Sequence, residues 1–467
     1  MPSLLKIIRD DLKANIPDGL NVPENFPNLI CTDSRNIKPG QWFLPIVGEA
    51  FDGHKFVTQS LEQADGFIYQ SDRKNLLTNS QIAKGIEVSD TLKFFQELAC
   101  VWRNILGTKV VGITGSTGKT TAKEMTAHIL SQESSTYYTQ GSFNNEVGVP
   151  KSLCELKPEH RFAVIEMGAR HVGDIEFLCK YVNPDVAVLL NVGTAHIGEF
   201  GSAENLRKTK QEIFTSTRSD CVAIYHEEDH ITADLAAKTH TTTLSFGTTS
   251  GQVRVVEQGI KDRKMNLAVQ SEAGKFQIQT PGYHLAYPIN FAAAVAVAQS
   301  LGLGTEPISR GIETFLGIDR RFKVYYSSSN VVIDDTYNAN PQSMKTGLES
   351  ITRGFPDYEK VLVLGDMLEL GSSSAAEHND IGKFCADFVK PNLLVTVGPE
   401  GRIIGEGAIS AGMDPRKISH FIDIDTAVRN LSQITSQGNL LYAKASNSIK
   451  LNKIIQAALQ DIETVAP

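Results

Sequence analysis

The sequence predicts a multidomain α/β protein, and three observations support this prediction. The chain has 467 residues, enough for about three domains of roughly 100 to 200 residues each. Short apolar runs bounded by turn residues alternate with helical patterns, as in a mostly parallel sheet covered by helices. With 41% hydrophobic and 21% charged residues, the composition is that of a folded globular chain and not of a disordered one.

Residues 1–88 are predicted to form a small mixed α/β domain. Strand-like pieces such as GQWFLPIVG at 40–48 are separated there by Gly, Pro and Asp turns.

Residues 89–316 are predicted to form a central domain built on a mostly parallel sheet. An amphipathic helix at 91–106 leads into KVVGIT, and the buried strand patterns FAVIEM at 162–167, DVAVLLN at 185–191 and CVAIY at 221–225 follow. The alternating pattern from about 240 to 280 predicts antiparallel strands. The alanine-rich helical pattern at 290–302 closes the domain.

Residues 317–467 are predicted to form a Rossmann-like, doubly wound domain. The strand patterns NVVIDDT, KVLVLGD at 360–366, NLLVTVG at 392–398 and NLLYAKAS at 439–446 alternate with helical ones. No internal repeat interrupts this organisation.

Charge and cysteine content exclude several classes of protein. The chain has 45 Lys and Arg against 53 Asp and Glu, a net charge of −8, so it lacks the basic excess of a nucleic-acid-binding protein. The six cysteines are scattered with no C-x-x-C pair, which predicts neither disulfides nor a zinc site. No secretory leader or membrane-length apolar run is recognised. We expect a cytoplasmic monomer without membrane insertion.

The segment GITGSTGKTT at 112–121 has the pattern of a phosphate-binding loop between a strand and a helix. In such loops glycines let N–H groups face phosphate oxygens, a lysine (Lys119) places its charge at the β- and γ-phosphates, and a hydroxyl (Thr120) ligates Mg²⁺. Ile113 stands where the strict pattern has its first Gly, and Gly112 precedes it. The residues expected to bind ATP are Thr114, Gly115, Ser116, Thr117, Gly118, Lys119, Thr120 and Thr121.

This loop and six further stretches resemble the Mur ligases, ATP-dependent enzymes that form amide bonds in peptidoglycan synthesis. The stretches are TDSRNIKPGQWFLPIVGEAFDGHKF at 32–56, GSFNNEVGVP at 141–150, NVGTAHIGEFGS at 191–202, KTKQEIF at 208–214, IDDTYNANPQSM at 333–344 and VLGDMLELG at 363–371. They are most similar to the family members that join D-alanyl-D-alanine to a UDP-N-acetylmuramoyl-tripeptide. The resemblance implies ATP and Mg²⁺ as cofactors, and chemistry agrees, because γ-phosphoryl transfer activates a carboxylate as an acyl phosphate.

The resemblance implies Lys119, His196 and Lys210 as catalytic residues. Glu166 lies at the end of a strand, where α/β sheets open their ligand crevice, and resembles the family's Mg²⁺-binding acid. His196 resembles a histidine near a second metal ion. Lys210, favoured over Lys208, resembles a lysine that is carbamylated in several family members. The implied metal site consists of Thr120, Glu166, His196 and, only if carbamylated, Lys210.

Four residues outside the loop resemble nucleotide contacts. Asn145 is favoured near the γ-phosphate, with Asn144 as the other register and Glu146 as a solvated acid. Asn290 resembles an adenine-binding asparagine, although two extra residues separate it from His284. In the third domain, the resemblance favours Arg321 over Arg320 and, near the ribose, Asp335 over Asp334.

Three short motifs resemble substrate-binding segments. In the first domain these are a DSR motif and a DGH turn that meet the UDP-sugar, and in the third domain a YNANP segment that receives the dipeptide. The residues are Asp33, Ser34, Arg35, Asp52, Gly53, His54, Tyr337, Asn338, Asn340 and Pro341. One departure is the stretch Lys444, Ala445, Ser446 and Asn447, where the family typically has K-G-S-R; only Lys444 keeps an expected role.

Three other functions compete with this interpretation. A sibling ligase that adds a single amino acid commonly carries D-N-P-R where this chain has YNANP, and folylpolyglutamate synthase should lack the DSR and DGH stretches. A nucleotide-binding regulator without ligase activity would leave Glu166, His196 and Lys210 together unexplained.

Overall fold

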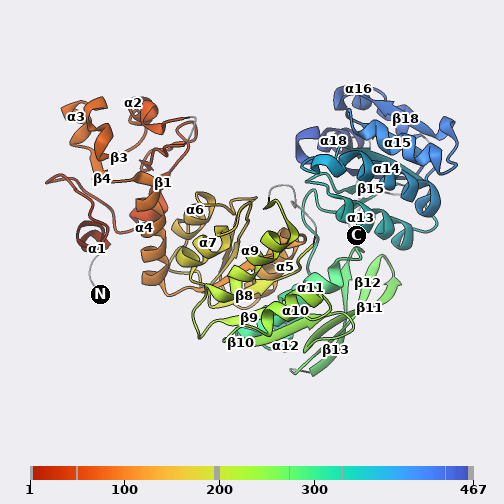
Figure 1. The fold of residues 1–467 in the computed structure, drawn as a ribbon, viewed down its shortest axis with the longest axis horizontal. Coiled ribbons are helices and arrows are strands. Elements are labelled where there is room, and N and C mark those ends of the chain that lie inside the picture. The colour runs from red at the N-terminus through yellow and green to blue at the C-terminus, as the bar shows by residue number, and fades with distance from the viewer. Residues whose placement is uncertain are drawn as a thin grey trace.

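The computed structural model describes residues 4–48, 51–193, 200–272, 274–327, 330–436 and 438–460. The chain forms three lobes in order, and the first and last stand above the middle one (Figure 1). Each lobe contains one sheet, with the strand orders β1-β2-β3-β4, β13-β12-β11-β10-β9-β8-β5-β7-β6 and β14-β15-β19-β16-β17-β18. The predicted α/β class is therefore confirmed, while the domain boundaries near 88 and 317 stay predictions.

The first lobe is a small parallel sheet with short helical turns. Its strands are β1 (Ile30–Cys31), β2 (Trp42–Phe43), β3 (Gly66–Gln70) and β4 (Gly85–Val88). Its helices are α1 (Leu4–Asp10), α2 (Val57–Ser60) and α3 (Asn79–Ile82), with 3₁₀ turns at Phe26–Leu29, Gly53–Phe56 and Ser71–Leu76.

Helix α4 (Thr91–Leu106) joins the first lobe to the middle one and matches the helix predicted at 91–106. Asp90 caps its start, and Gly107 ends it with a left-handed φ of 66°. A single hydrophobic core runs from Trp42 in the first lobe, through Leu98 of α4, to Leu153 in the middle lobe. The first lobe is thus continuous in packing with one face of the middle sheet.

The middle sheet is mostly parallel and is covered by helices on both faces. Its strands are β5 (Lys109–Thr114), β6 (Thr136–Tyr138), β7 (Phe162–Glu166), β8 (Val186–Leu189), β9 (Val222–His226), β10 (Thr242–Gly247), β11 (Val253–Lys261), β12 (Lys264–Ser271) and β13 (Gly274–Pro281). Its helices are α5 (Lys119–Ser131), α6 (Gly148–Cys154), α7 (Asp174–Val182), α9 (Ala203–Thr215), α10 (His230–Ala236), α11 (Tyr287–Ser300) and α12 (Thr305–Glu313). Because neighbouring strand residues point to opposite faces, Val110 packs in the core of α4, α6 and α7, and Val111 in that of α5, α11 and α12.

The strands from 240 to 280 differ in part from the prediction. β11, β12 and β13 are antiparallel as expected, but β10 pairs in parallel with both β9 and β11. The parallel sheet therefore extends two strand pairings further than the sequence pattern indicated.

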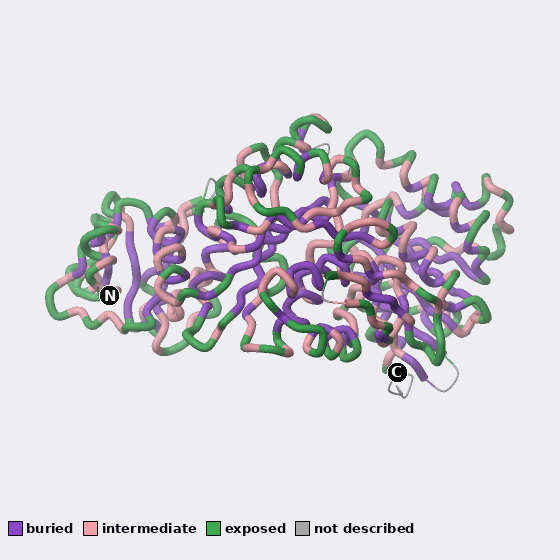
Figure 2. The backbone as a smooth tube through the Cα atoms, turned by 90° about the horizontal axis from the view of Figure 1, so that it is seen from below, coloured by how far each residue is buried: buried purple, intermediate pink, exposed green. Residues whose placement is uncertain are grey.

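Helix α11 explains the alanine-rich pattern before the third lobe. From Phe291 to Ala298 every residue is buried. Figure 2 shows the buried segments of the chain in purple. The helix packs on α5 on one side and on the sheet on the other, so small alanine side chains let it approach both closely.

The third lobe has a parallel sheet with one antiparallel edge strand, β14. Its strands are β14 (Lys323–Tyr326), β15 (Val331–Asp334), β16 (Lys360–Gly365), β17 (Leu393–Val397), β18 (Ile418–Phe421) and β19 (Leu440–Lys444). Its helices are α13 (Pro341–Gly354), α14 (Ser374–Phe384), α15 (Gly401–Ser410), α16 (Ile424–Arg429), α17 (Leu431–Thr435) and α18 (Asn452–Gln460). Two separate cores, one on each face, fill this lobe.

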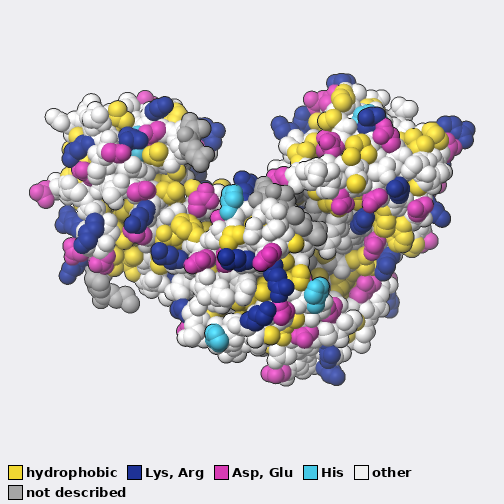
Figure 3. Space-filling model, viewed as in Figure 1, with side chains coloured by type: hydrophobic (Ala, Val, Ile, Leu, Met, Phe, Trp, Pro, Cys, Tyr) yellow, Lys and Arg dark blue, Asp and Glu magenta, His cyan; other side chains and the backbone are white. Residues whose placement is uncertain are grey.

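The surface between the first and third lobes is hollowed above the middle lobe (Figure 3). Among the described residues, none of the helices combines the length and the apolar character needed to cross a bilayer.

Candidate active site

The predicted phosphate loop forms between β5 and α5. Gly118 begins α5 with a left-handed φ of 79°, and a Cβ at this position would stand 3.0 Å from Asn290 Oδ1. Glycine suits both constraints, because other residues rarely adopt this conformation. The amides of the first helical turn, from Lys119 to Thr121, have no carbonyl partner within the helix. The loop therefore presents N–H donors to an anion.

The side chain of Lys119 folds back over this loop. Its Nζ donates to the carbonyl oxygen of Gly115 at 2.8 Å and to that of Ser116 at 3.4 Å. Burial lowers the pKa of Lys119, and the nearby carboxylate of Glu166 opposes this shift. A phosphate oxygen would be a stronger, charge-assisted partner for this ammonium than the carbonyls that hold it.

Side chains from distant segments meet at Thr120. Its hydroxyl donates to Glu166 Oε2 at 2.9 Å and accepts from Arg321 Nη2 at 2.9 Å. The other carboxylate oxygen of Glu166 accepts from Asn144 Nδ2 at 2.9 Å. The structure thus brings together Thr120, Glu166 and Arg321, which the sequence placed in one site.

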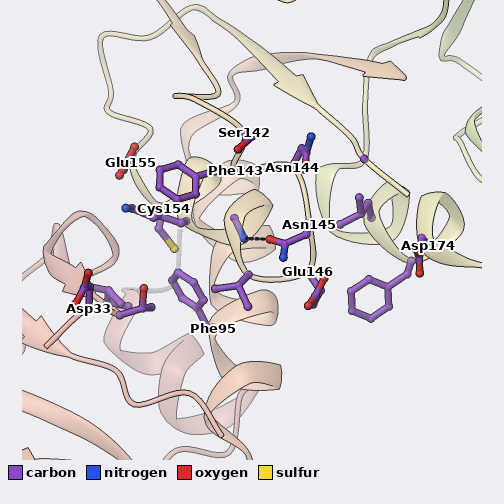
Figure 4. Close-up of a pocket in the computed structure, with 18 of the residues that line it drawn as sticks. Asp33, Phe95, Ser142, Phe143, Asn144, Asn145, Glu146, Cys154, Glu155 and Asp174 are labelled. Atoms are coloured by element: carbon purple, nitrogen blue, oxygen red, sulfur yellow. Dashed lines mark hydrogen bonds between the residues drawn. The ribbon is translucent and has the colours of Figure 1, made fainter. Parts of the chain in front are cut away.

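Asn144, rather than the favoured Asn145, reaches this cluster. Asn145 Oδ1 instead accepts the Gly148 N–H at 2.9 Å at the start of α6, and Figure 4 shows this bond pointing away from Asn144. Glu146 is exposed, as expected. Asn144 is therefore the register that contacts Glu166. Asn145 lines the larger cavity as well, and its contact with the nucleotide stays a prediction.

Lys210 on α9 is 3% exposed, whereas Lys208 is exposed. Lys210 Nζ lies 3.5 Å from Thr114 Oγ1. Burial, together with the positive charge of Lys119, lowers the pKa of Lys210 to about 7. A large fraction of this amine is therefore neutral at neutral pH. Its carbamylation stays a prediction.

Arg321 crosses from the third lobe to the phosphate loop. Its guanidinium lies over the Tyr337 ring, 4.0 Å from the centroid. Arg320 instead donates to the Thr336 carbonyl and to Asn447 Oδ1, both at 2.8 Å. Of the two registers, Arg321 is therefore the one that contacts the loop.

Asp335 is held by two side chains of β19. Its Oδ2 lies 2.8 Å from Lys444 Nζ and accepts from the Tyr442 hydroxyl at 2.9 Å. Lys444 also donates to the Asn338 carbonyl at 3.0 Å. Asp334, the other register, accepts from the Thr336 hydroxyl at 2.6 Å, and burial raises its pKa. In the altered KASN stretch, Lys444 thus positions Asp335.

Two cavities border the phosphate loop. The larger, about 1770 Å³, extends from Asp33 in the first lobe to Glu369 in the third, and Lys119 and Lys210 line it. The smaller, about 600 Å³, is lined by Gly118 and the third-lobe residues Arg321 and Asp335. Since Gly115 and Ser116 line the first cavity and Thr117 and Thr121 the second, the loop forms a wall that both share.

Several residues of the smaller cavity were missed by the sequence reasoning. His226 stacks on Phe246, with ring centroids 5.3 Å apart and planes 10° apart. Burial lowers the pKa of His284 to about 4, so this ring is neutral. Asn290, which was expected, also lines the cavity, and its Nδ2 donates to the Ala286 carbonyl at 2.6 Å. Only the pairing of β9 with β10 brings the stacked rings together, so no local motif could have found them.

The two first-lobe motifs have different roles. The DSR residues line the larger cavity, and the Arg35 guanidinium lowers the pKa of Asp33 to about 2 through a hydrogen bond of 2.8 Å. In the DGH turn, His54 Nε2 accepts from Gln70 N at 3.0 Å, so its Nδ1 carries the proton and donates to Asp52 at 2.7 Å. His54 is buried and, like Asp52, does not line either cavity among the described residues. Both residues hold the turn in this structure, and their contact with the UDP-sugar stays a prediction.

The DGH glycine, Gly53, does line the larger cavity. A Cβ there would stand 2.9 Å from the backbone of Ile46. This close approach of two backbone segments explains why the turn has a glycine at its centre.

The residues of the YNANP segment make structural contacts, and their role in receiving the dipeptide stays a prediction. Asn340 caps α13, with its Oδ1 accepting from Ser343 N at 2.8 Å, and Pro341 occupies the first turn. Tyr337 lies under Arg321, and the Asn338 carbonyl binds Lys444. These residues lie outside the described lining of both cavities, while Gln342, Ser343 and Thr346 of α13 line the smaller one.

His196 lies outside the described residues. Within the described part of the chain, no group of three or more His, Cys, Asp and Glu side chains is arranged to hold a metal ion. Thr120 and Glu166 remain the candidate metal-binding pair.

A phosphate loop facing two cavities, on a three-lobed α/β scaffold, defines a nucleotide-dependent enzyme. The chain belongs to the Mur ligase family: residues 113–298 match the Mur ligase middle domain, and residues 320–447 match the glutamate ligase domain of Mur ligases. A UDP-N-acetylmuramoyl-tripeptide--D-alanyl-D-alanine ligase of Bacillus subtilis is 32% identical over 92% of this chain and 93% of its own.

Solved structures agree with this placement. MurF from Acinetobacter baumannii superposes with a TM-score of 0.81 at 32% identity, covering 92% of this chain and 93% of that one. MurF from Thermotoga maritima, solved in complex with ADP, has a TM-score of 0.80 at 27% identity and covers 94% and 99%. The resemblance read from the sequence motifs is confirmed.

Proposed function

We propose that this protein joins D-alanyl-D-alanine to a UDP-N-acetylmuramoyl-tripeptide and converts ATP to ADP and phosphate. The names of its relatives support this reaction. One structural observation carries the proposal: the phosphate loop is a wall common to a cavity of about 600 Å³ and a cavity of about 1770 Å³ that reaches all three lobes. Such a loop can hold ATP from one side and pass its γ-phosphoryl to a substrate on the other.

The smaller cavity is proposed to bind the nucleoside of ATP. The Phe246–His226 pair offers apolar ring surface, and Asn290 lies against the loop at Gly118. Asp335, kept near Lys444, is an acceptor that suits ribose hydroxyls. The ADP-bound Thermotoga maritima relative supports nucleotide binding by this fold.

Thr120 and Glu166 are proposed to hold Mg²⁺. A hydroxyl and a carboxylate 2.9 Å apart are hard oxygen donors, and Mg²⁺ in nucleotide sites commonly takes one or two carboxylates plus substrate phosphates. When bound, Mg²⁺ would neutralise charge on the phosphates.

The larger cavity is proposed to hold the tripeptide, with its terminal carboxylate near Lys119. A carboxylate oxygen forms a bond to the γ-phosphorus while the bond to the ADP oxygen breaks, which gives an acyl phosphate and ADP. The dipeptide amine then bonds to the acyl carbon, phosphate leaves, and the amine gives up a proton. Lys119, Arg321 and the loop amides supply positive potential where charge accumulates, and Lys210 adds a nearby amine.

The ends of this cavity are proposed to bind the two substrates. Asp33, Ser34 and Arg35 in the first lobe would contact the UDP-sugar. The third lobe would receive the dipeptide, with Asn340 and Pro341 fixing the start of α13 and Tyr337 supporting Arg321. A dipeptide separates its amine from its carboxylate more than an amino acid does, so it requires the longer site that a three-lobed cavity provides.

Measuring phosphate release tests the proposal. We expect release to require both substrates and to be far faster with D-alanyl-D-alanine than with D-alanine, L-lysine or meso-diaminopimelate. UDP-N-acetylmuramoyl-tripeptides ending in L-lysine and in meso-diaminopimelate should both be supplied. Preferential ligation of a single amino acid would indicate a sibling activity, and substrate-independent behaviour would indicate a regulator.

A further inference from the structure

The Asn191 side chain, just after β8, is bound to the first half of the phosphate loop. Its Oδ1 accepts from Ser116 N at 3.1 Å and from Thr117 N at 3.0 Å, and its Nδ2 donates to the Thr117 carbonyl at 3.1 Å. The two backbone amides and the Asn191 side-chain amide group therefore each have a hydrogen-bond acceptor. The Asn191 side chain thus satisfies the Thr117 amide and shares the Ser116 amide with the backbone carbonyl of Asn191.

The Asn191 backbone is itself held on both sides. Leu190 N donates to the Thr114 carbonyl at 3.0 Å, and Ser116 N also approaches the Asn191 carbonyl at 3.2 Å. Beyond Asn191, Val192 N donates to Asp229 Oδ2 at 3.0 Å. Since these contacts anchor Asn191 to β5 and to the start of α10, its side chain is a fixed support and not a mobile one.

These contacts divide the loop into two halves. The amides of Ser116 and Thr117 are taken by Asn191, although both residues were expected to bind ATP. The amides of the first turn of α5 have no intrahelical acceptor. The second half of the loop is thus the part whose donors are open to phosphate oxygens.

We propose that Asn191 is a positioning residue that keeps the first half of the phosphate loop in its binding shape before the nucleotide arrives. The inference rests on the proposed binding of ATP to this loop. The loop contains two glycines, Gly115 and Gly118, so without support it would sample many backbone conformations. Ordering them beforehand removes an entropic cost from nucleotide binding.

Hydrogen exchange of the nucleotide-free protein directly tests whether the Asn191 side chain holds the first half of the phosphate loop. In Asn191→Ala, we expect Thr117, within the peptide spanning 113–121, to exchange at least about tenfold faster because its amide loses its acceptor. Ser116 keeps the backbone carbonyl of residue 191 as an acceptor at 3.2 Å, so its exchange should change less. In Asn191→Asp, a carboxylate oxygen still accepts from both amides, and we expect their protection to be retained. This second variant keeps the test decisive if the alanine variant folds poorly.

Calorimetry with ADP tests the consequence for binding. We expect Asn191→Ala to bind ADP at least about tenfold more weakly, with its affinity for the UDP-N-acetylmuramoyl-tripeptide within about twofold of wild type. Asn439→Ala is the matched control, because it also removes an asparagine side chain that accepts a backbone amide, that of Glu359 at 2.9 Å, but in the third lobe. It should leave ADP affinity unchanged.

Unchanged protection of Thr117 together with unchanged ADP affinity in Asn191→Ala would overturn the inference. An equal loss of ADP and tripeptide affinity would also overturn it, because that pattern indicates general damage to the fold. None of these measurements requires ligation, so a wild-type protein that binds ADP but fails to ligate D-alanyl-D-alanine would contradict the proposed function alone.

Discussion

The pH dependence of stability should reveal Lys210 as a buried amine with a pKa near 7. The perturbation is Lys210→Met, which keeps an unbranched side chain of similar length and removes the titrating group. Lys210 is 3% exposed, and its pKa falls from the usual 10.5 to about 7. The folded protein therefore releases this proton at lower pH than the unfolded chain does.

The sign follows from proton linkage. Between about pH 7 and pH 10.5 the unfolded state binds more protons than the folded state, so stability rises with pH in this window. Each pH unit is worth about 1.4 kcal/mol when the group is fully shifted. From pH 7 to pH 9 the wild type should therefore gain about 2 kcal/mol relative to Lys210→Met. The penalty for burying the charge is complete below pH 7 and absent above pH 10.5.

Urea unfolding followed by tryptophan fluorescence at pH 7, 8 and 9 measures this difference. The buffers should be free of bicarbonate, so that Lys210 stays an amine. Lys208→Met is the matched control: Lys208 lies on the same helix but is exposed, so its stability difference from wild type should not vary with pH. A difference between wild type and Lys210→Met that is constant from pH 7 to pH 9 would refute the reasoning.

Three further predictions concern chemistry, motion and packing. Lys119→Ala should lower the rate of phosphate release at least about a hundredfold, because removing one preorganised charge at a reacting group costs about 3 kcal/mol. Lys109→Ala, at the exposed start of β5, the strand that precedes the phosphate loop, should keep near-normal turnover. Normal turnover of folded Lys119→Ala would contradict the site. X-ray scattering should detect a smaller radius of gyration when ADP and the UDP-N-acetylmuramoyl-tripeptide bind together. The larger cavity extends from Asp33 in the first lobe to Glu369 in the third, so a substrate that fills it should draw these lobes together across the hollow. An unchanged radius at saturation argues against this closure. Gly53→Ala should lower the melting temperature of the first lobe and reduce its free energy of unfolding by about 1 to 3 kcal/mol, because its Cβ would meet the Ile46 backbone at 2.9 Å. Gly304→Ala is the control, because a Cβ at Gly304 meets nothing within 4 Å. Equal melting temperatures for the two variants would rule out the clash.

The sequence by itself determined the α/β class, the phosphate loop and the family. These features depend on local order along the chain: apolar runs of strand length, a glycine-rich turn before a helix, and motifs of fixed spacing. The amphipathic pattern located helix α4 to the residue, and the structure shows that Asp90 and Gly107 fix its two ends locally. Local signals of this kind can be recognised in the sequence without knowing which segments are in contact in the fold.

Only the tertiary structure decided which neighbouring residue enters the site. Asn144 and Asn145, or Arg320 and Arg321, are equivalent in composition, but the direction of each side chain depends on the backbone at that point and on its distant partner. Arg321 meets Thr120 across 201 positions of sequence, and Asn191 meets Thr117 across 74. Since such contacts depend on how strands are ordered in a sheet, no local pattern contains them.

Which lysine of α9 is buried was also decided only by the tertiary structure. Lys208 and Lys210 are two positions apart on one helix, yet the packing of α9 leaves the first in solvent and places the second beside Lys119. The charge repulsion and loss of hydration that lower the pKa of Lys210 come from residues brought together by folding. The sequence supplied the lysine, and the three-dimensional environment determines its chemistry.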